Sequence, residues 1–392
     1  MNTEDNCCLV GYHAMVKNIK DISLALFFTG GVGLQAWDHV GNLDRELAIY
    51  HQLSNQLKSV HIVSYGGNQD LCYAASLGNL FLHPVAWLRT PFFTRYFVMA
   101  RYKKILEKVD IFKTNQILGS DIPLWLKEKM GKKVIVRCGY LYSDFMKQNG
   151  VDKRTLAQAI ALEGSSFQTA DAGVVTSNWQ RDIVIRDYKV PNEKIHVIPN
   201  YVVTDLFKPV IAEKTFDLIY VGRCGKEKNV YNLLQAMSLL KKQGKNYRLH
   251  IVGGCSNDPK IRKIASASEL NIVFSDNVPN SQLPVLLNSA TSFILPSFHE
   301  GHPKSLLEAM SCGLPCIGSN VQGIREDIIH NETGYLCNTE PSSIANAIHT
   351  VMTDESLQME MGRKARKYIL SHYSLDMTVH KELDLLQKVM AE

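Results

Sequence analysis

The chain has 392 residues, of which 45% are hydrophobic and 21% charged, and its formal net charge is +5. This length exceeds that of one ordinary domain, so we expect a soluble protein with two globular domains. The modest charge argues against nucleic acid as a partner, and no apolar run approaches the roughly 20 residues of a membrane-spanning helix. Nine cysteines, an odd number, argue against a complete disulfide framework, and residues 1–13 lack the apolar core of an export signal. We therefore expect a cytoplasmic protein.

The first part of the chain alternates expected strands and helices. A buried strand at 23–28 precedes a glycine-rich turn, apolar residues at helical spacing cover 36–57, and a second strand follows at 60–64. Arg45 and Glu46 lie in the middle of the expected helix, where we predict that both are surface charges.

The glycine-rich turn has two interpretations. The hexapeptide GVGLQA at 31–36 follows an expected strand and matches the fingerprint of a dinucleotide-binding fold. An NAD site also requires an acid near the end of the second strand, but residues 64–66 are Ser, Tyr and Gly. The NAD interpretation is therefore disfavoured, although the glycines still allow backbone N–H groups to approach an anion closely.

Aromatic and basic residues interleave at 87–104, with the sequence WLRTPFFTRYFVMARYKK. One interpretation is a helix face that rests on an anionic membrane, with aromatic rings at the interface and cations toward the headgroups. The other is an ordinary amphipathic helix in which Phe93, Phe97 and Val98 pack inward. The pattern leaves both interpretations open.

Polar residues follow a buried strand that we expect at 134–136. Ligands of parallel sheets collect at the carboxyl ends of strands, so Arg137 and Tyr140 are candidates for the acceptor side of a binding site. A structural role for Arg137, bonded to loop carbonyls, explains the sequence equally well. Further strands are expected at 109–112, 172–176 and 195–198.

The second half of the chain alternates strands and helices more plainly, which predicts a parallel sheet covered on both faces. We expect strands at 216–221, 248–252, 272–274, 292–295 and 316–318. The first of these ends in Gly222 and Arg223, and Lys228 follows five residues after the arginine. Two cations at the carboxyl end of a strand and the start of a helix form a site suited to a diphosphate.

A second candidate site follows the strand at 292–295. A loop with Glu300 leads into a helix that carries Glu308, and the free N–H groups near Lys304 and Ser305 offer a place for phosphate. An anion bound there would have one carboxylate on each side, and each carboxylate could accept hydrogen bonds from hydroxyls. A phosphate flanked by two hydroxyl-bearing groups describes a nucleotide sugar.

The motif EGHPKSLLEAM at 300–310, with GLP at 313–315 and GIRE at 323–326, resembles the E-x7-E motif of retaining glycosyltransferases of family 4. The loop at 222–228 is similar to the G-R-x4-K signature of that family. The resemblance implies the GT-B fold, an α/β fold of two Rossmann-like domains that face each other across a deep cleft. It implies an acceptor-side domain at 1–205, a donor-binding domain at 206–374 and a last helix, about 375–392, that packs back on the first domain.

The resemblance also implies roles for individual residues. Glu300 would bind the donor sugar, and Arg223 and Lys228 would stabilise the departing diphosphate, which makes these three the expected catalytic residues. Glu308 would bind the ribose. The other residues expected at the donor are Gly33, Gly222, Val278, Gly301, Lys304, Ser305 and Leu306. Acceptor-side candidates are Asn115, Arg137 and Tyr140, since this chain has Lys113 and Asn115 where relatives often carry a histidine.

The expected reaction is transfer of a sugar from a UDP- or GDP-linked donor to a hydroxyl of a saccharide or lipid-linked saccharide, in cell-envelope polysaccharide synthesis. No DxD-like pair stands in a plausible loop, so we expect no metal and no tightly bound cofactor. A sugar-nucleotide 2-epimerase of the same fold and an inactive nucleotide-sugar-binding module remain alternatives.

Overall fold

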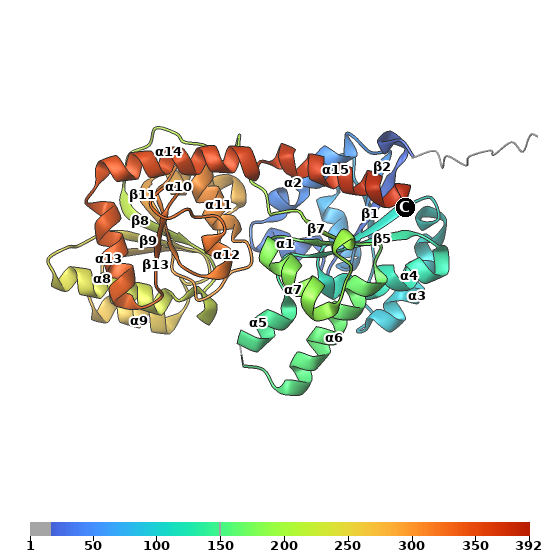
Figure 1. The fold of residues 1–392 in the computed structure, drawn as a ribbon, viewed down its shortest axis with the longest axis horizontal. Coiled ribbons are helices and arrows are strands. Elements are labelled where there is room, and N and C mark those ends of the chain that lie inside the picture. Colours follow the sequence, from blue (N-terminus) through green and yellow to red (C-terminus); the bar gives the residue numbers. More distant parts are fainter. Residues whose placement is uncertain (1–16, 149) are drawn as a thin grey trace, which may run out of the picture.

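The computed structural model describes residues 17–148 and 150–392, which form two α/β domains that lie side by side (Figure 1). Residues 1–16, which include the whole segment tested for an export signal (1–13), lie outside the described residues. No helix in the described part of the chain is long and apolar enough to cross a bilayer. Each domain consists of a parallel sheet between helices, and each has its own hydrophobic core.

The sheet of the first domain has the strand order β3-β2-β1-β4-β5-β6-β7, and all neighbouring strands are parallel. The interior strand β1 is buried along its whole length, as its apolar sequence predicts. The strands are β1 (Ser23–Phe27), β2 (Ser59–Ser64), β3 (Phe81–Pro84), β4 (Ile111–Thr114), β5 (Lys133–Cys138), β6 (Ala172–Val175) and β7 (Ile195–Val197).

The helices of the first domain include a break that the sequence analysis missed. The single helix expected at 36–57 is two helices, because Gly41 has a φ of +71° and ends the first one. The helices are α1 (Leu34–His39), α2 (Leu43–Ser54), α3 (Pro91–Leu106), α4 (Asp121–Met130), α5 (Tyr142–Gln148), α6 (Lys153–Thr169) and α7 (Asn178–Tyr188), with short 3-10 helices η1 (Ile19–Asp21), η2 (Gly67–Leu77), η3 (Ile117–Gly119) and η4 (Asn192–Lys194).

The sheet of the second domain has the order β10-β9-β8-β11-β12-β13 and is also parallel throughout. Its strands are β8 (Phe216–Val221), β9 (Leu249–Val252), β10 (Ile272–Ser275), β11 (Ala290–Leu295), β12 (Cys316–Ser319) and β13 (Tyr335–Cys337). Its helices are α8 (Val230–Lys242), α9 (Pro259–Ala267), α10 (Leu283–Asn288), α11 (Lys304–Ser311), α12 (Gln322–Arg325), α13 (Pro341–Met352) and α14 (Glu355–His372), with η5 (Lys226–Lys228) and η6 (Asn280–Gln282).

The last helix, α15 (Leu375–Ala391), returns to the first domain. Figure 1 shows α14 and α15 as a red band along one edge that passes from one domain to the other. Val379, Leu385, Leu386 and Val389 of α15 are buried in the core of the first domain. A backbone hydrogen bond of 2.8 Å from Val202 N–H to the carbonyl of residue 373 fixes the point of crossing.

Candidate active site

A cleft of about 870 Å³ lies between the two domains. The loops that follow the strands of both sheets line it, which is where ligands of open α/β sheets bind. In the second domain the strand order reverses between β8 and β11, and the loops after these two strands carry Arg223 and Glu300 to the cleft. The first domain contributes the segment between α1 and α2 and the loop after β5.

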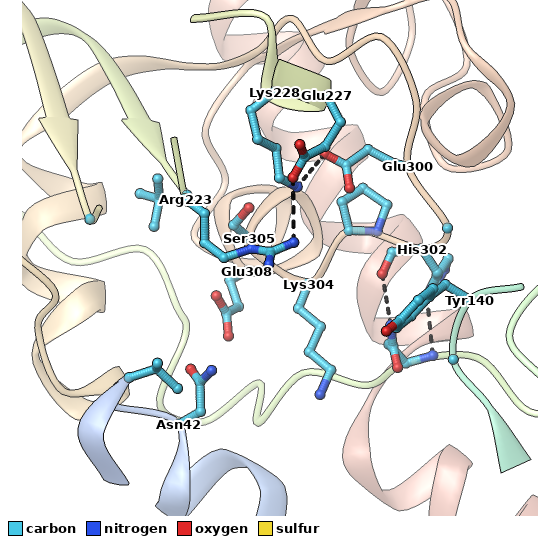
Figure 2. Close-up of a pocket in the computed structure, with 18 of the residues that line it drawn as sticks. Asn42, Tyr140, Arg223, Glu227, Lys228, Glu300, His302, Lys304, Ser305 and Glu308 are labelled. Atoms are coloured by element: carbon cyan, nitrogen blue, oxygen red, sulfur yellow. Dashed lines mark hydrogen bonds and ion pairs between the residues drawn. The ribbon is translucent and has the colours of Figure 1, made fainter. Parts of the chain in front are cut away.

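Two cations follow β8, as the sequence predicts. Arg223 extends into the open cleft with 78% of its side chain exposed, and its Nη2 lies 3.4 Å from Glu227 Oε1. Lys228 is largely buried, and its Nζ lies 2.6 Å from Glu300 Oε1. The same Glu300 oxygen accepts a hydrogen bond of 2.7 Å from the Ser297 hydroxyl. Figure 2 shows Lys228, Glu227 and Glu300 converging beside Arg223, so the predicted catalytic residues do share one site.

The backbone around this site is held by close contacts. Asn229 has a left-handed φ of +56°, and its Nδ2 donates hydrogen bonds of 2.9 Å to the carbonyls of Pro296 and Thr339. These bonds tie the loop after β8 to the loop after β11 and to the segment after β13. Gly253 has a φ of +114°, and a Cβ there would lie 2.4 Å from the carbonyl oxygen of Gly222. Only glycine allows the loops after β8 and β9 to approach so closely.

Helix α11 presents its N-terminus to the cleft. The N–H groups of Lys304 and Ser305 have no acceptor among the described residues, whereas the next two N–H groups bond to the Pro303 carbonyl. This end of the helix therefore has free donors and the positive end of the helix dipole. Gly301 and Ser305 line the cleft beside it. The arrangement is suited to an anion such as phosphate.

Glu308, one and a half turns inside α11, is only 1% exposed. Its Oε1 accepts hydrogen bonds from Asn280 Nδ2 at 2.9 Å and from Arg45 Nη1 at 3.2 Å. Its Oε2 is buried without a hydrogen-bond partner in the described part of the chain. A carboxylate oxygen left unpaired in this way is costly, and a ligand hydroxyl in the cleft would satisfy it.

Two charged residues of α2 lie at this site, which corrects the prediction that both are surface charges. Arg45 bonds to Glu308 as described, and Glu46 pairs with Lys304 of α11. Against the effect of burial, Lys304 and Arg45 lower the pKa of Glu46 to about 2. Burial lowers the pKa of Lys304 to about 8, although Glu46 opposes this shift. The sequence shows neither pair, because each joins residues more than 250 positions apart.

His302 belongs to the 300–310 motif, but the sequence analysis gave it no role. In the structure its hydrogen bonds connect the two domains. Its Nδ1 accepts a hydrogen bond of 3.1 Å from the backbone N–H of Asn200, so the ring proton lies on Nε2, 3.1 Å from Asp327 Oδ1. Asn200 Nδ2 also donates to the His302 carbonyl at 2.7 Å. The loop before α11 is thereby fastened to the segment that links the two sheets.

Two family models match successive parts of the chain. The model described as Glycosyltransferase Family 4 matches residues 47–206, and that described as Glycosyl transferases group 1 matches residues 204–368. The chain belongs to the family 4 glycosyltransferases. The resemblance drawn from the 300–310 motif is therefore confirmed.

Two curated bacterial proteins are similar to much of the chain. The chain is 25% identical over 259 residues to alpha-maltose-1-phosphate synthase of Mycolicibacterium smegmatis, covering 59% of this chain and 66% of that enzyme. It is 22% identical over 382 residues to the capsular polysaccharide biosynthesis glycosyltransferase CapM of Staphylococcus aureus, covering 91% of this chain and 87% of that one. The match thus spans just under two thirds of the first enzyme and most of the second.

Solved structures confirm the GT-B fold. Sucrose-phosphate synthase from Thermosynechococcus elongatus has a TM-score of 0.76 at 18% identity, with 94% of this chain and 99% of that chain covered. Anabaena HepE in complex with UDP has a TM-score of 0.75 at 14% identity, with 94% and 100% covered. At these identities the likeness shows the fold alone.

The glycine-rich turn after β1 does not line the cleft, so the expected place of Gly33 at the donor is corrected. The anion that its backbone approaches is the carboxylate of Asp70, which is fully buried. Asp70 Oδ1 accepts the N–H of Leu34 at 2.9 Å, and Oδ2 accepts the N–H of Gly66 at 3.2 Å. An NAD phosphate would have to displace this side chain. The cleft-lining residues of this region are instead at 39–45.

Two other predicted positions also lie away from the cleft. Leu306 is fully buried in the core of the second domain, and its N–H already bonds to the Pro303 carbonyl at 3.1 Å. Neither its side chain nor its N–H is therefore available to contact the sugar nucleotide. Asn115 faces a small separate cavity, and Gln116 lines the cleft in its place. The neighbouring Lys113 is buried in an ion pair with Glu382 of α15, so it does not face the acceptor side.

The remaining acceptor-side candidates do line the cleft. Tyr140 is 45% exposed there, and its ring lies 6.1 Å from that of Phe145. Arg137 donates from Nη2 to Asn200 Oδ1 at 2.9 Å and from Nη1 to the Asn115 carbonyl at 3.5 Å. Arg137 thus has the structural contacts that the sequence left as an alternative. In residues 17–148 and 150–392, no three His, Cys, Asp or Glu side chains are grouped to hold a metal.

Helix α3 exposes the aromatic residues of its first half, whereas Tyr102 is buried. Phe93 and Phe97 are 59% and 38% exposed, which contradicts the interpretation in which both pack inward, whereas Val98 is buried as expected. Phe92 and Tyr96 are also about half exposed. Arg95 does not point freely into solvent, because its guanidinium lies 4.4 Å from the Phe92 ring, 5.1 Å from the Tyr96 ring and 5.0 Å from the Trp125 ring.

Proposed function

We propose that this glycosyltransferase moves a hexose, with retention of configuration, from UDP- or GDP-linked sugar to a hydroxyl of a saccharide or lipid-linked saccharide. The observation that carries the proposal is the unpaired buried oxygen of Glu308, which lies in a cleft with Arg223, Lys228 and Lys304. A ribose hydroxyl would satisfy the carboxylate while the cations and the free N–H groups of α11 bind the diphosphate.

The rest of the donor follows from that placement. The base would lie against the loop after β10, near Val278, and the sugar would lie between the diphosphate and Glu300. Glu300 Oε1 is occupied by Lys228 and Ser297, so Oε2 is the oxygen available to sugar hydroxyls. Negative charge grows on the diphosphate as the glycosidic bond breaks, and the preorganised cations stabilise it without a metal.

The acceptor would enter from the first domain, past Tyr140 and Gln116. The acceptor oxygen bonds to the anomeric carbon on the face that the diphosphate leaves, and the acceptor's proton passes to the departing phosphate. Closure of the two domains around the bound substrates would exclude water from this step and limit hydrolysis of the donor. The names of relatives support the setting: CapM acts in capsular polysaccharide biosynthesis, and HepE was solved with UDP and with UDP-glucose.

The test of the donor site is a thermal-shift screen of UDP, GDP, ADP and NAD, each with Mg²⁺ and with EDTA. A ligand at a hundred times its dissociation constant stabilises by about 2.7 kcal/mol, which is readily detected. We expect a shift with UDP or GDP that EDTA leaves unchanged, followed by turnover of the matching sugar nucleotide. Two results would contradict the proposal: a shift with NAD alone, or the absence of a shift with every nucleoside diphosphate tested.

We also propose that the aromatic face of α3 rests on an anionic membrane, where a lipid-linked acceptor is reached. The exposed rings of Phe92, Phe93, Tyr96 and Phe97 can enter the interfacial region. Residues 89–133 hold eleven Lys and Arg against four Asp and Glu. Lys113 is buried in its ion pair with Glu382, but Arg101, Lys103 and Lys104 of α3 are exposed, so the charge at the surface suits anionic headgroups.

Sedimentation with vesicles tests this surface. We expect the protein to sediment with vesicles that contain phosphatidylglycerol, and to remain in solution with pure phosphatidylcholine or at high salt. Phe93→Ser with Phe97→Ser should abolish the association. The matched control is Ile160→Ser with Leu370→Ser, which changes two apolar residues of similar exposure on α6 and α14. Equal losses in both pairs would contradict a specific face.

A further inference from the structure

The donor-binding helix of the second domain is held by side chains of the first. Arg45 and Glu46 are consecutive residues of α2, and they bond to Glu308 and Lys304, one turn apart on α11. Figure 2 shows Lys304 and Glu308 extending from α11 toward the segment of the first domain that carries Asn42. The side chains of Arg45 and Glu308 are 15% and 1% exposed, so water screens this contact little.

The backbone brings α2 to this position. Asn280 donates its N–H to the Gly41 carbonyl at 2.8 Å, which joins η6 to the turn before α2. Gly41 approaches the second domain so closely that a Cβ would lie 2.4 Å from the Val278 carbonyl oxygen. The side-chain amide of the same Asn280 bonds to Glu308, so one residue connects the turn, the loop near Val278 and the carboxylate.

The two oxygens of the Glu308 carboxylate have different surroundings, and this difference indicates what the contact with Arg45 does. Arg45 and Asn280 share Oε1, and Oε2 remains buried and unpaired. Arg45 therefore does not occupy the oxygen that a ribose hydroxyl would use. It fixes the plane of the carboxylate so that the second oxygen remains available. In the same way Glu46 fixes Lys304 at the end of α11 where a phosphate would bind.

We propose that Arg45 and Glu46 are positioning residues of the donor site: they act on nucleotide through Glu308 and Lys304, and the site is complete only when the two domains are closed. This inference rests on the proposed function, because it names what completes that same site. Domain closure and recognition of the donor would then be a single event. The diphosphate would reach its full affinity only when the acceptor-side domain has closed against α11.

Calorimetric titration of the full chain with UDP or GDP, whichever stabilises it, tests the inference by a double-mutant cycle. We expect Arg45→Met to weaken nucleotide binding at least tenfold in the otherwise unchanged protein, and less than twofold in the Glu308→Gln background. Glu46→Gln should behave likewise with and without Lys304→Met. The matched control is Asp44→Asn, an exposed neighbour on α2, which should leave affinity unchanged. An effect of Arg45→Met that is equal in both backgrounds would overturn the inference.

Small-angle scattering without nucleotide separates this inference from the proposed function. We expect the radius of gyration to rise in the Arg45→Met, Glu46→Gln double variant and to stay constant in Asp44→Asn. If the unchanged protein binds no nucleoside diphosphate, the proposed function fails, and the positioning role fails with it even where the scattering shows an open form. If nucleotide binds and neither affinity nor scattering responds to the double variant, the positioning role alone fails.

Discussion

Gly253 and Gly244 both have positive φ angles, but their surroundings differ. A Cβ at Gly253 would lie 2.4 Å from the Gly222 carbonyl oxygen, whereas nothing lies within 4 Å of a Cβ at Gly244. Gly253→Ala should therefore cost the backbone strain of about 1–2 kcal/mol and an added steric term, while Gly244→Ala should cost the strain alone. Urea denaturation of both variants measures the difference. Equal losses of stability would mean that the loops separate without cost.

We expect the substitutions Glu300→Gln and Glu308→Gln to affect different quantities, the first kcat and the second the affinity for nucleotide. Glu308→Gln should weaken the binding of the nucleoside diphosphate by about 1–3 kcal/mol, because the ribose loses a charged acceptor. Glu300→Gln should change that affinity little and lower kcat by roughly 10²–10³, because its free oxygen faces the sugar. Calorimetry with the nucleotide and initial rates with the sugar nucleotide separate the two effects. An exposed acid far from the cleft, Glu332→Gln, is the control.

For individual residues, the sequence predicts a place in the site when the partners are near in the chain or belong to a recognisable motif. Glu300, Arg223 and Lys228 were predicted from spacing and resemblance, and the structure brings them within one cleft. The spacing of α2 says only that Arg45 is opposite the apolar face, and it cannot reveal that another domain covers that face. Asp70 escaped prediction for the same reason, since its carboxylate fills the turn after β1 from a separate segment.

Most of the strands were predictable from apolar runs bounded by turn residues. The prediction at 216–221 coincides with β8, and that at 292–295 falls within β11. The two strands that were not predicted, β3 and β13, are the short strands at one edge of each sheet. Their sequences, FLHP and YLC, are too short and too mixed in polarity to show a period. An edge strand depends on its neighbour for its hydrogen bonds more than on its own composition.

The last helix depends on a buried ion pair. Lys113 of β4 and Glu382 of α15 have side chains that are 2% and 3% exposed. Lys113→Met alone should lower the free energy of unfolding by about 3–5 kcal/mol, because Glu382 would remain buried without its partner. The double variant Lys113→Met, Glu382→Leu should recover most of that loss, since apolar side chains of similar volume avoid the cost of burying charge. Chemical denaturation checks both, and a double variant as unstable as the single one would show that the charges themselves are required.

The arrangement of the two domains determines the electrostatics of the cleft. The pKa values of its charged side chains could not be predicted from the sequence of either domain alone. The pKa of Lys304 is lowered to about 8 first by burial, and the burial depends on the closed arrangement of the domains. Lys304 is therefore protonated below pH 8 and loses its charge as the pH rises through 8. The pKa of the nearby Arg45 is raised by Glu308 and Glu46 against the effect of burial, so Arg45 keeps its charge throughout this range.

The affinity for nucleoside diphosphate should follow the charge of Lys304. From pH 6.5 to 7.5 we expect a constant Kd, and above pH 8 the Kd should rise toward tenfold per pH unit, because a bound diphosphate favours the protonated amine. Lys304→Arg should flatten this rise, since a guanidinium remains charged at every pH tested. The comparison requires only titrations of both proteins with one nucleotide between pH 6.5 and 9.5. An identical rise in Lys304→Arg would assign the titration to another group and would leave Lys304 outside the diphosphate site.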